Sequence, residues 1–526
     1  MPQPQPVLIA GEWRPSRAAG TFEPTNPRTR QATGETYPVS GPEEVTEAVE
    51  AAAAASEALQ ESYPAGAAAF LEAFAGRIEA RSGEIVAMAE AETGLPAAPR
   101  LAEIELPRTT GQLRQAAASA RARSWSLPTI DTGSGIRSMY RALEGGVAVF
   151  GPNNFPLAFN SVSGGDFAAA VGAGCPVIAK ANSSHPGTTR LLAEEARAAV
   201  GEAGLPEATV QLIYRTDHEV GKSLVSHAKI GATGYTGSRS AGLALKAAAD
   251  AAGKPIYLEL SSINPVYVLP GAIRERGAEI AEEFQTSCLM GTGQFCTNPG
   301  IVVLLAGDEA EGFIARSAAG FDKAPVGTLL AAGVESGMEA SVRTLQAAGA
   351  ELVTGGTTGG GTGYSYSNTL LRTTAERFLD DPEALQTEAF GNESLFVVAG
   401  DVDEAAEVAR RLEGNLTGCI YSDTGGSDDD AYERIAPALR RRVGRLLNDK
   451  MPTGVAVVPS MNHGGPYPAT GHPGFTAVGI PASMLRFAML CCYDEVRPHR
   501  LPVELRDENP GGVWRLIDGD WTQADA

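Results

Sequence analysis

An α/β fold with at least two lobes is predicted for this chain by three observations. Its 526 residues exceed what a single hydrophobic core usually serves. Apolar strand-like runs alternate with helix-like stretches from about residue 141 to 260, and the same alternation returns from 261 to 451. This pattern is typical of parallel sheets covered by helices on both faces, which bind ligands outside the carboxyl ends of their strands.

The part of the chain before this alternation is predicted to hold one or two hairpins followed by helices. VLIAGEW and the turn-rich GTFEPTNPRTR suit short antiparallel strands. The Ala-rich stretch EEVTEAVEAAAAASEAL predicts a helix, for which Gly41-Pro42 is the start signal. Helical patterns continue to about Arg121.

The strands of both lobes are predicted from short apolar runs. In the first lobe these are GVAVFGP, PVIAK, ATVQLIY, AKIGATG and KPIYLEL, and in the second VYVLP, IVVLLAG, SLFVVAG and GCIYSD. The Gly-rich TGGTTGGGTGYSYS is interpreted as a mobile surface loop, because its glycines lack phosphate-loop spacing. The last stretch, with LRFAMLCCYDEV and LPVELRDENPGGVWRLIDG, lies outside both patterns and is expected to form an interface.

Composition and charge exclude several classes of protein. The net charge of -21 argues against nucleic acid and against anionic membranes as partners, because both need Lys/Arg patches. Six cysteines without a C-x-x-C pair favour a reducing cytosol over a disulfide scaffold. The N-terminus has no signal-peptide pattern, and no window is apolar enough for a membrane helix, so a cytoplasmic protein is expected.

One cysteine stands in surroundings that favour reactivity. Cys296 lies in MGTGQFCTNPG, a run of glycines and small polar residues, where a reactant could approach its sulfur. The other cysteines in apolar or helical contexts, Cys175, Cys288 and Cys419, are interpreted as structural. An activated cysteine also needs donors for developing charge and usually a base.

Two side chains at strand ends could supply those needs. Asn154 follows the strand GVAVFGP, so its amide is expected at the carboxyl edge of the sheet, as an oxyanion donor or as an Asx turn before Pro156. Glu259 ends an otherwise apolar strand, where a carboxylate acts as a general base or forms a structural ion pair. The segment 231–242 gives a strand, a glycine turn and a helix start, which suits a pyrophosphate or a plain loop.

These pieces, in this order, resemble the aldehyde dehydrogenase superfamily over nearly the whole chain, from about Val7 to Trp514. Within it the phrases SSINP, GTGQFCTNPG and HGGPYPAT are similar to bacterial 2,5-dioxovalerate (α-ketoglutarate semialdehyde) dehydrogenases and NADP-dependent fatty-aldehyde dehydrogenases. The motifs that carry the resemblance are NFP at 154–156, Lys180 before a helix, TGS at 236–238, LEL at 258–260, GQFCT at 293–297 and EAFG at 388–391.

The resemblance implies a division into three parts. A Rossmann-type NAD(P)-binding domain is expected in residues 1–120 and 145–258, and an α/β catalytic domain in 259–455. An oligomerisation arm is expected from 121–144 together with 470–526. A homodimer or homotetramer is implied on the same grounds.

The resemblance also assigns roles. Cys296 would be the nucleophile, Asn154 and the Cys296 backbone N–H would hold the oxyanion, and Glu259 would activate the water that hydrolyses a thioester. Gly237 and Ser238 would contact the cofactor, and Glu388 and Phe390 would position its nicotinamide ribose.

The sequence departs from the family pattern where the cofactor's adenosine binds. Ser183 stands where a glutamate often binds the ribose hydroxyls, which removes repulsion against a 2′-phosphate. Lys180 and Arg215 could attract that phosphate, although Arg215 could equally be a solvated surface charge. NADP is therefore the expected cofactor, with NAD as the alternative.

The mouth of the site also differs, since MNHGGPYPATGHPGF replaces a common Gly-Gly-x-Lys run. His463 and His472 lie there and are interpreted as surface or loop residues, not metal ligands, because no second ligand stands at zinc-like spacing. No metal is expected.

The substrate is the least determined feature. For a dicarboxylic semialdehyde, Arg486 and the group Asn160, Ser161 and Ser163 are candidates for binding the carboxylate. For a long apolar aldehyde, an apolar funnel of Phe155, Leu157, Phe159 and Phe475 would serve. The leading hypothesis is oxidation of α-ketoglutarate semialdehyde to 2-oxoglutarate. The alternatives are a fatty or general aldehyde dehydrogenase, a CoA-acylating enzyme, a Cys-His hydrolase and a catalytically silent binding relative.

Overall fold

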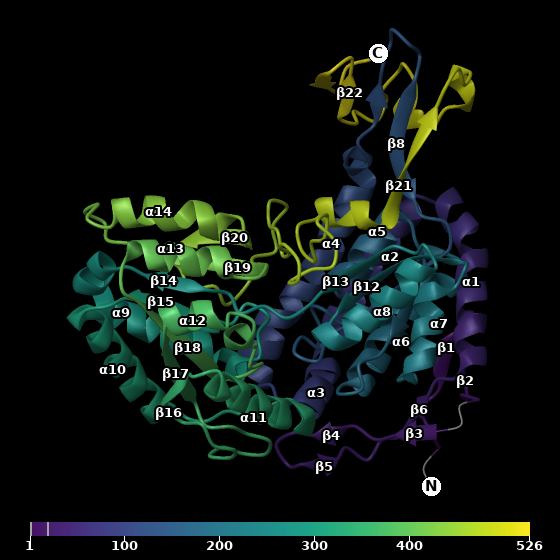
Figure 1. Ribbon diagram of the computed structural model, residues 1–526. Coiled ribbons are helices and arrows are strands. Elements are labelled where there is room, and N and C mark those ends of the chain that lie inside the picture. The colour runs from purple at the N-terminus through teal and green to yellow at the C-terminus, as the bar shows by residue number, and fades with distance from the viewer. Residues whose placement is uncertain (1–2, 18–19) are drawn as a thin grey trace.

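Two seven-stranded sheets, each with helices packed around it, organise the chain, and a five-stranded sheet projects away from them (Figure 1). The computed structural model describes residues 3–17 and 20–526. The predicted α/β class is confirmed. Each predicted strand of the two lobes is present, and each lies close to its predicted position.

The first sheet has its ligand-binding edge where the strand order reverses. β9 lies between β10 and β12, so the chain runs outward from β9 in one direction and then returns to its other side. The loops that follow β9 and β12 therefore diverge and leave a crevice at the carboxyl ends of these strands. The order is β13 (Ile256–Glu259), β12 (Ile230–Thr236), β9 (Gly146–Phe150), β10 (Val177–Lys180), β11 (Val210–Ile213), β1 (Val7–Ile9) and β2 (Glu12–Arg14).

The first five strands of that order are parallel, and β1 and β2 add an antiparallel edge, which confirms the predicted N-terminal hairpin. The first helix begins at Pro42 with Gly41 as its N-cap, as predicted. The helices of this part are α1 (Pro42–Glu61), α2 (Ala65–Ala80), α3 (Ser82–Thr93), α4 (Leu106–Ala122), α5 (Gly165–Ala173), α6 (Pro186–Ala203), α7 (His218–Ser226) and α8 (Arg239–Ala251).

The second sheet is parallel except for the edge strand β16. The order is β16 (Glu351–Thr354), β17 (Thr369–Thr374), β18 (Glu393–Ala399), β15 (Ile301–Leu305), β14 (Val266–Val268), β19 (Asn415–Tyr421) and β20 (Val443–Asn448). Its helices are α9 (Pro270–Leu289), α10 (Asp308–Lys323), α11 (Ala332–Ala347), α12 (Ala375–Asp380), α13 (Val402–Arg411) and α14 (Asp429–Arg440). The Gly-rich segment between β16 and β17 is mostly loop, as predicted, and its Tyr364 N–H donates to the Pro27 carbonyl.

The projecting sheet joins two segments that are far apart in the sequence. β7 (Thr129–Ile130) and β8 (Arg137–Ala142) form a hairpin, which β21 (Ala488–Tyr493), β22 (Arg515–Ile517) and β23 (Asp520–Thr522) extend. Exposed apolar side chains on it include Met489, Leu490 and Trp521. Two smaller hairpins pair β3 (Gly20–Phe22) with β6 (Tyr37–Val39) and β4 (Thr25–Asn26) with β5 (Gln31–Ala32). Within residues 3–17 and 20–526, no helix has the length and apolar character to cross a membrane.

Candidate active site

The crevice predicted by the strand order contains a cavity of about 310 Å³. The loop after β9 and the loop after β12 both line it, and so does the segment that leaves β13 for the second sheet. Asn154, Glu259, Cys296, Glu388 and Phe390, all singled out in the sequence, meet on its wall, and Gly237 and Ser238 line it too. The cavity therefore brings together groups from both sheets.

A second cavity, of about 410 Å³, adjoins the first and shares several lining residues with it, among them Pro152, Asn153 and Thr236. Its wall contains all five of the other predicted cofactor contacts, Lys180, Ser183, Arg215, Gly237 and Ser238. The two cavities thus form a path along the carboxyl edge of the first sheet.

The residues of this path fit a dinucleotide with an anionic end. Lys180 and Arg215 line the outer cavity, and no ion pair is found for either within the described ranges. Burial, and then the charge of Arg215, lower the pKa of Lys180 to about 8, so an added anion would relieve this pair of cations. Asp217 also lines this wall, and α8 begins beside it at Arg239.

The loop that carries Cys296 is held by a side-chain amide just before β14 and by close packing of its backbone. Asn264 donates from Nδ2 to the carbonyl oxygens of Cys296 (2.8 Å) and Asn298 (2.9 Å). Gly293 has a φ of +69°, and a Cβ there would lie 2.0 Å from the Gly391 carbonyl oxygen. The glycine that precedes the cysteine in GQFCT is therefore required by a left-handed turn and by close backbone packing.

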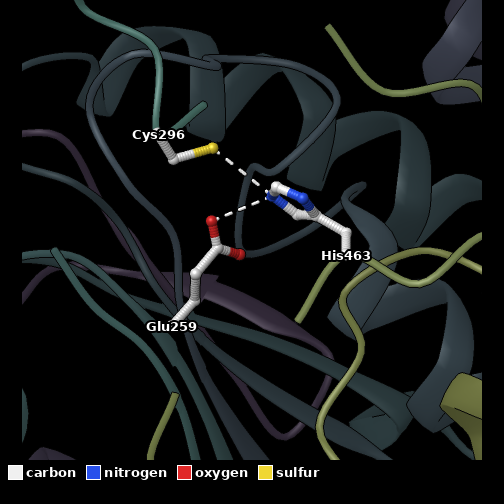
Figure 2. Close-up of side chains that lie close together, drawn as sticks. All are labelled: Glu259, Cys296 and His463. Atoms are coloured by element: carbon white, nitrogen blue, oxygen red, sulfur yellow. Dashed lines mark hydrogen bonds and ion pairs between the residues drawn. The ribbon is translucent and has the colours of Figure 1, made fainter. Parts of the chain in front are cut away.

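Cys296 and Glu259 share a third neighbour, because the imidazole of His463 lies beside both of them (Figure 2). The His463 Nε2 atom is 3.3 Å from Cys296 Sγ and 2.9 Å from Glu259 Oε1. Both His463 and Glu259 are 1% exposed. His463 lies in an irregular segment, but it is buried, so of the predicted surface or loop positions only the loop is correct. His472 is exposed in a loop, as predicted.

A long irregular segment brings His463 to this position. Its later part pairs with β13, where the Leu260 N–H donates to the Ala469 carbonyl and the Gly471 N–H to the Leu258 carbonyl. The Thr476 hydroxyl accepts from the His463 N–H at 3.0 Å. In the sequence, the only sign that this segment is unusual is that it replaces the Gly-Gly-x-Lys run common in the family. That replacement does not predict that the His463 imidazole points toward Cys296 and Glu259.

The geometry differs from that of a cysteine hydrolase. In such a triad one imidazole nitrogen meets the nucleophile and the other meets the orienting acid. Here Nε2 approaches both Cys296 and Glu259, and Nδ1 is buried with no hydrogen-bond partner in the part of the chain that is described. The imidazole therefore contacts the sulfur and the carboxylate through the same nitrogen and does not link them in the manner of such a triad.

The same three side chains form a donor set that can bind a metal. One ligand atom each from Glu259, Cys296 and His463 lies within 4.8 Å of the others. The absence of a metal stays a prediction. The lack of a second ligand at zinc-like spacing does not support it, however, because Glu259 and Cys296 come close to His463 from distant segments of the chain.

The thiol of Cys296 is protonated at rest. Burial raises the pKa of Cys296 well above its ordinary value, and the Glu259 carboxylate raises it further, while the Arg108 guanidinium opposes both. A thiolate beside a carboxylate in this environment is costly, so Cys296 could act as a nucleophile only if its proton left as the sulfur attacked.

We expect this electrostatic environment to be visible in the pH dependence of thiol alkylation. The rate of Cys296 alkylation by iodoacetamide should reach half its maximum at a pH well above about 8.5, the pKa of a free cysteine. Glu259→Gln removes a negative charge that disfavours the thiolate, so the midpoint should move to lower pH. Glu388→Gln should move it less, because Glu388 acts more weakly on the same sulfur. An unchanged midpoint in Glu259→Gln would contradict this account.

Asn154 and Glu388 are both held by backbone groups. The Asn154 Nδ2 donates to the Gln294 carbonyl at 2.9 Å, two residues before Cys296, so the amide lies next to the cysteine loop. Glu388 accepts from the Ser262 N–H at 3.2 Å. Burial raises the pKa of Glu388, and hydrogen bonds from Ser261 and Ser262 oppose that rise.

An apolar cluster lies behind His463. Phe155 packs edge-on against Phe159 and Phe295, with ring centroids 5.2 and 5.3 Å apart, and Phe159 lies 5.7 Å from the imidazole. Phe475 belongs to the same cluster. Leu157, the fourth member predicted for a funnel, packs instead in the large core around the first sheet.

The polar residues predicted to bind a substrate carboxylate do not line the cavity at Cys296, so that prediction is wrong. Arg486 is 2% exposed and pairs with Asp166 at 2.8 Å, so it neutralises a buried acid. Asn160 donates to Pro156 and Thr189, and Ser163 donates to Leu157. These groups, and the buried Ser161, lie inside the fold.

A doubly wound sheet with two adjoining cavities at its carboxyl edge, next to a cysteine and a buried carboxylate, is the arrangement expected of a cofactor-dependent enzyme. The model of the aldehyde dehydrogenase family matches residues 13–465, and the chain belongs to this family, whose members use NAD(P) to oxidise aldehydes to acids. A relative named alpha-ketoglutaric semialdehyde dehydrogenase 2, from Azospirillum brasilense, is 38% identical over 97% of this chain and 98% of its own length. An alpha-ketoglutaric semialdehyde dehydrogenase from Acinetobacter baylyi is 34% identical over 96% of each.

Solved structures agree with the fold. PnpE in complex with nicotinamide adenine dinucleotide has a TM-score of 0.80 at 20% identity, covering 95% of this chain and 100% of that one. Lactaldehyde dehydrogenase from Escherichia coli has a TM-score of 0.78 at 23% identity, covering 94% and 99%. At these identities the likeness is one of fold alone.

Proposed function

We propose that this enzyme oxidises α-ketoglutarate semialdehyde to 2-oxoglutarate, with NADP as its preferred cofactor. The observation that carries the proposal is the cavity in which Cys296, Glu259 and Asn154 meet, in a chain whose relatives at 38% and 34% identity are both named for that semialdehyde. The chemical properties of these three side chains suit the roles that the family resemblance implies for them.

In the first half of the reaction Cys296 Sγ adds to the aldehyde carbon, and the thiol proton passes to the adjacent Glu259–His463 pair. The carbonyl oxygen becomes an oxyanion that the Asn154 amide and the Cys296 N–H stabilise by hydrogen bonds. A bound NADP would supply the hydride acceptor that this oxidation needs, and Glu388 and Phe390 would hold its ribose. A thioester on Cys296 follows.

In the second half Glu259 removes a proton from water, which attacks the thioester carbon and releases the acid and the thiol. Glu259 Oε2 is buried and has no partner in the described structure, so one carboxylate oxygen is available while the other holds His463. Proton removal by a buried base that faces the acyl carbon is worth about 10²- to 10⁴-fold in rate.

The preference for NADP is proposed from Lys180, Ser183 and Arg215, which line one cavity. Ser183→Glu should lower kcat/KM for NADP by about 100-fold and leave kcat/KM for NAD equal or higher, because a carboxylate repels the 2′-phosphate and accepts from ribose hydroxyls. Steady-state kinetics with both cofactors measure this. Ser223→Glu, which adds the same charge on an exposed face of α7, is the matched control. Equal losses with both cofactors would argue against the assignment.

The proposed substrate is tested by absorbance at 340 nm with purified enzyme, NADP or NAD, and either α-ketoglutarate semialdehyde or a medium-chain alkanal. A kcat/KM for the semialdehyde at least 100-fold above that for the alkanal supports the proposal. The reverse preference would favour the fatty or general aldehyde alternative, which the phenylalanine cluster beside His463 supports. Reaction with neither would favour a silent relative.

Product analysis with added coenzyme A separates the remaining enzymatic alternative. A CoA-acylating enzyme would release an acyl-CoA, whereas Glu259 predicts release of the free acid.

For the projecting sheet we propose an oligomerisation role, in a dimer or tetramer. We also propose that residues 1–120 and 145–258 form the cofactor domain and residues 259–455 the catalytic domain. Light scattering that finds a monomer would count against the oligomerisation role.

Free thiols throughout the described chain support a cytoplasmic location, which fractionation can test.

A further inference from the structure

A guanidinium without a carboxylate partner lies next to the active site. Arg108 is on α4, and its Cζ lies 5.0 Å from the ring centroid of Phe159 and 5.5 Å from that of Phe155. Its Nε and Nη2 are buried and have no hydrogen-bond partner among residues 3–17 and 20–526. No ion pair involves it in the same residues. Stacking on aromatic faces holds a guanidinium while leaving its N–H edge free.

The nearby acid cannot serve Arg108, because it is already used. Glu105 pairs with Arg100, and its Oε1 accepts from the backbone N–H groups of Leu157 (2.8 Å) and Ala158 (2.9 Å). Arg100 also donates to the Asn154 carbonyl oxygen at 3.1 Å, so this arginine supports the loop after β9. Of the two arginines stacked on Phe155, only Arg108 lacks hydrogen-bond partners.

Arg108 is close enough to the reacting groups to act on their charges. Its guanidinium opposes the rise in the pKa of Cys296, and the Glu259 carboxylate in turn favours the charged form of Arg108. Burial lowers the pKa of Arg108, which is the cost of a cation with too few partners. An anion bound in this region would recover that cost.

A second cation approaches the same sulfur from the other sheet. Arg445 on β20 has a buried Nε with no partner in the described structure, and its Nη atoms lie 3.5 Å from the Gly454 carbonyl, at the limit for a hydrogen bond. A thiolate formed on Cys296 would favour the charged form of Arg445 as well. Arg108 and Arg445 therefore place two guanidinium groups near the sulfur, in addition to the carboxylates of Glu259 and Glu388.

We propose that Arg108 binds the carboxylate of the aldehyde substrate through its guanidinium fork, and that Arg445 adds a second positive charge to this subsite. The ligand class is a short aliphatic aldehyde that ends in a carboxylate or 2-oxocarboxylate. The fork of donors matches two carboxylate oxygens, and the phenylalanine cluster covers the methylene groups between the charged and reacting ends. This inference rests on the proposed function for the identity of the acid.

The test compares an anionic and a neutral aldehyde in the same variants. With α-ketoglutarate semialdehyde, Arg108→Met should lower kcat/KM by about 100-fold, mainly through KM. The loss with pentanal should be at least about tenfold smaller, because it contains only the effect of the guanidinium on the Cys296 thiol. Arg108→Lys should recover part of the loss, because it restores the charge without the fork. Arg316→Met, on an exposed part of α10, is the control for loss of an arginine. Equal losses with both aldehydes in Arg108→Met would overturn the proposal and indicate a structural role.

A binding measurement keeps this inference separate from the proposed function. Calorimetric titration of the enzyme with 2-oxoglutarate needs no turnover, and its dissociation constant should rise at least tenfold in Arg108→Met and stay unchanged in Arg316→Met. If the wild type binds 2-oxoglutarate through Arg108 but does not oxidise the semialdehyde, the subsite stands and the proposed substrate falls. Absence of binding to the wild type, or equal binding to Arg108→Met, overturns the subsite.

Discussion

Replacing Cys296 with alanine is expected to lower aldehyde-dependent NADPH formation by about 10⁴-fold or more, with folding and cofactor binding intact. The reaction proposed here splits one oxidation into two steps on a single sulfur, and no other cysteine lines the cavity that holds Asn154 and Glu259. Absorbance at 340 nm measures turnover. Calorimetry with NADP should give a dissociation constant within threefold of the wild type, because the outer cavity is untouched.

Two controls make the Cys296→Ala result specific. Cys492→Ala changes an exposed thiol of the projecting sheet and should retain full activity. Iodoacetamide should then inactivate Cys492→Ala and the wild type at equal rates, since the essential thiol is present in both. Turnover that survives in Cys296→Ala would mean that another group is the nucleophile.

The parts of this molecule that could be predicted from the sequence are those encoded by neighbouring residues. An apolar run such as GVAVFGP or KPIYLEL becomes a buried strand, and a polar residue at its end reaches the carboxyl edge of the sheet. Asn154 and Glu259 were predictable in this way, and both lie on the cavity wall. Lys180 at the end of β10 follows the same rule.

The parts that could not be predicted depend on contacts between distant segments. His463 meets Cys296 and Glu259 across sequence separations of 167 and 204 residues, from a segment with no strand or helix pattern. Arg486 stands beside the predicted mouth in sequence, but Asp166 holds it in the interior. The helical pattern around Arg108 does not indicate which direction its side chain takes. That direction depends on Phe155 and Phe159, which follow β9 and pack against its guanidinium.

Replacing Glu259 with glutamine is expected to separate the two halves of the reaction. Glutamine keeps the size of the side chain and an oxygen that accepts from His463, but it cannot take a proton from water. The charge that raises the pKa of Cys296 also disappears, so the thiolate forms more readily. His463 remains beside the sulfur to accept the thiol proton, so the first half should proceed while the second fails. The expected result is a burst of about one NADPH per active site and then turnover reduced by about 10²- to 10⁴-fold.

Rapid-quench mass spectrometry should find the acyl group on Cys296 after the burst in Glu259→Gln, and hydroxylamine should release it, as expected for a thioester. Glu282→Gln makes the same chemical change on an exposed part of α9 and should show neither a burst nor a loss of turnover. Steady turnover without a burst in Glu259→Gln would assign water activation to another base. Since the His463 Nε2 already faces both the sulfur and the carboxylate, His463→Gln in the Glu259→Gln background would then show whether the imidazole had taken over that proton.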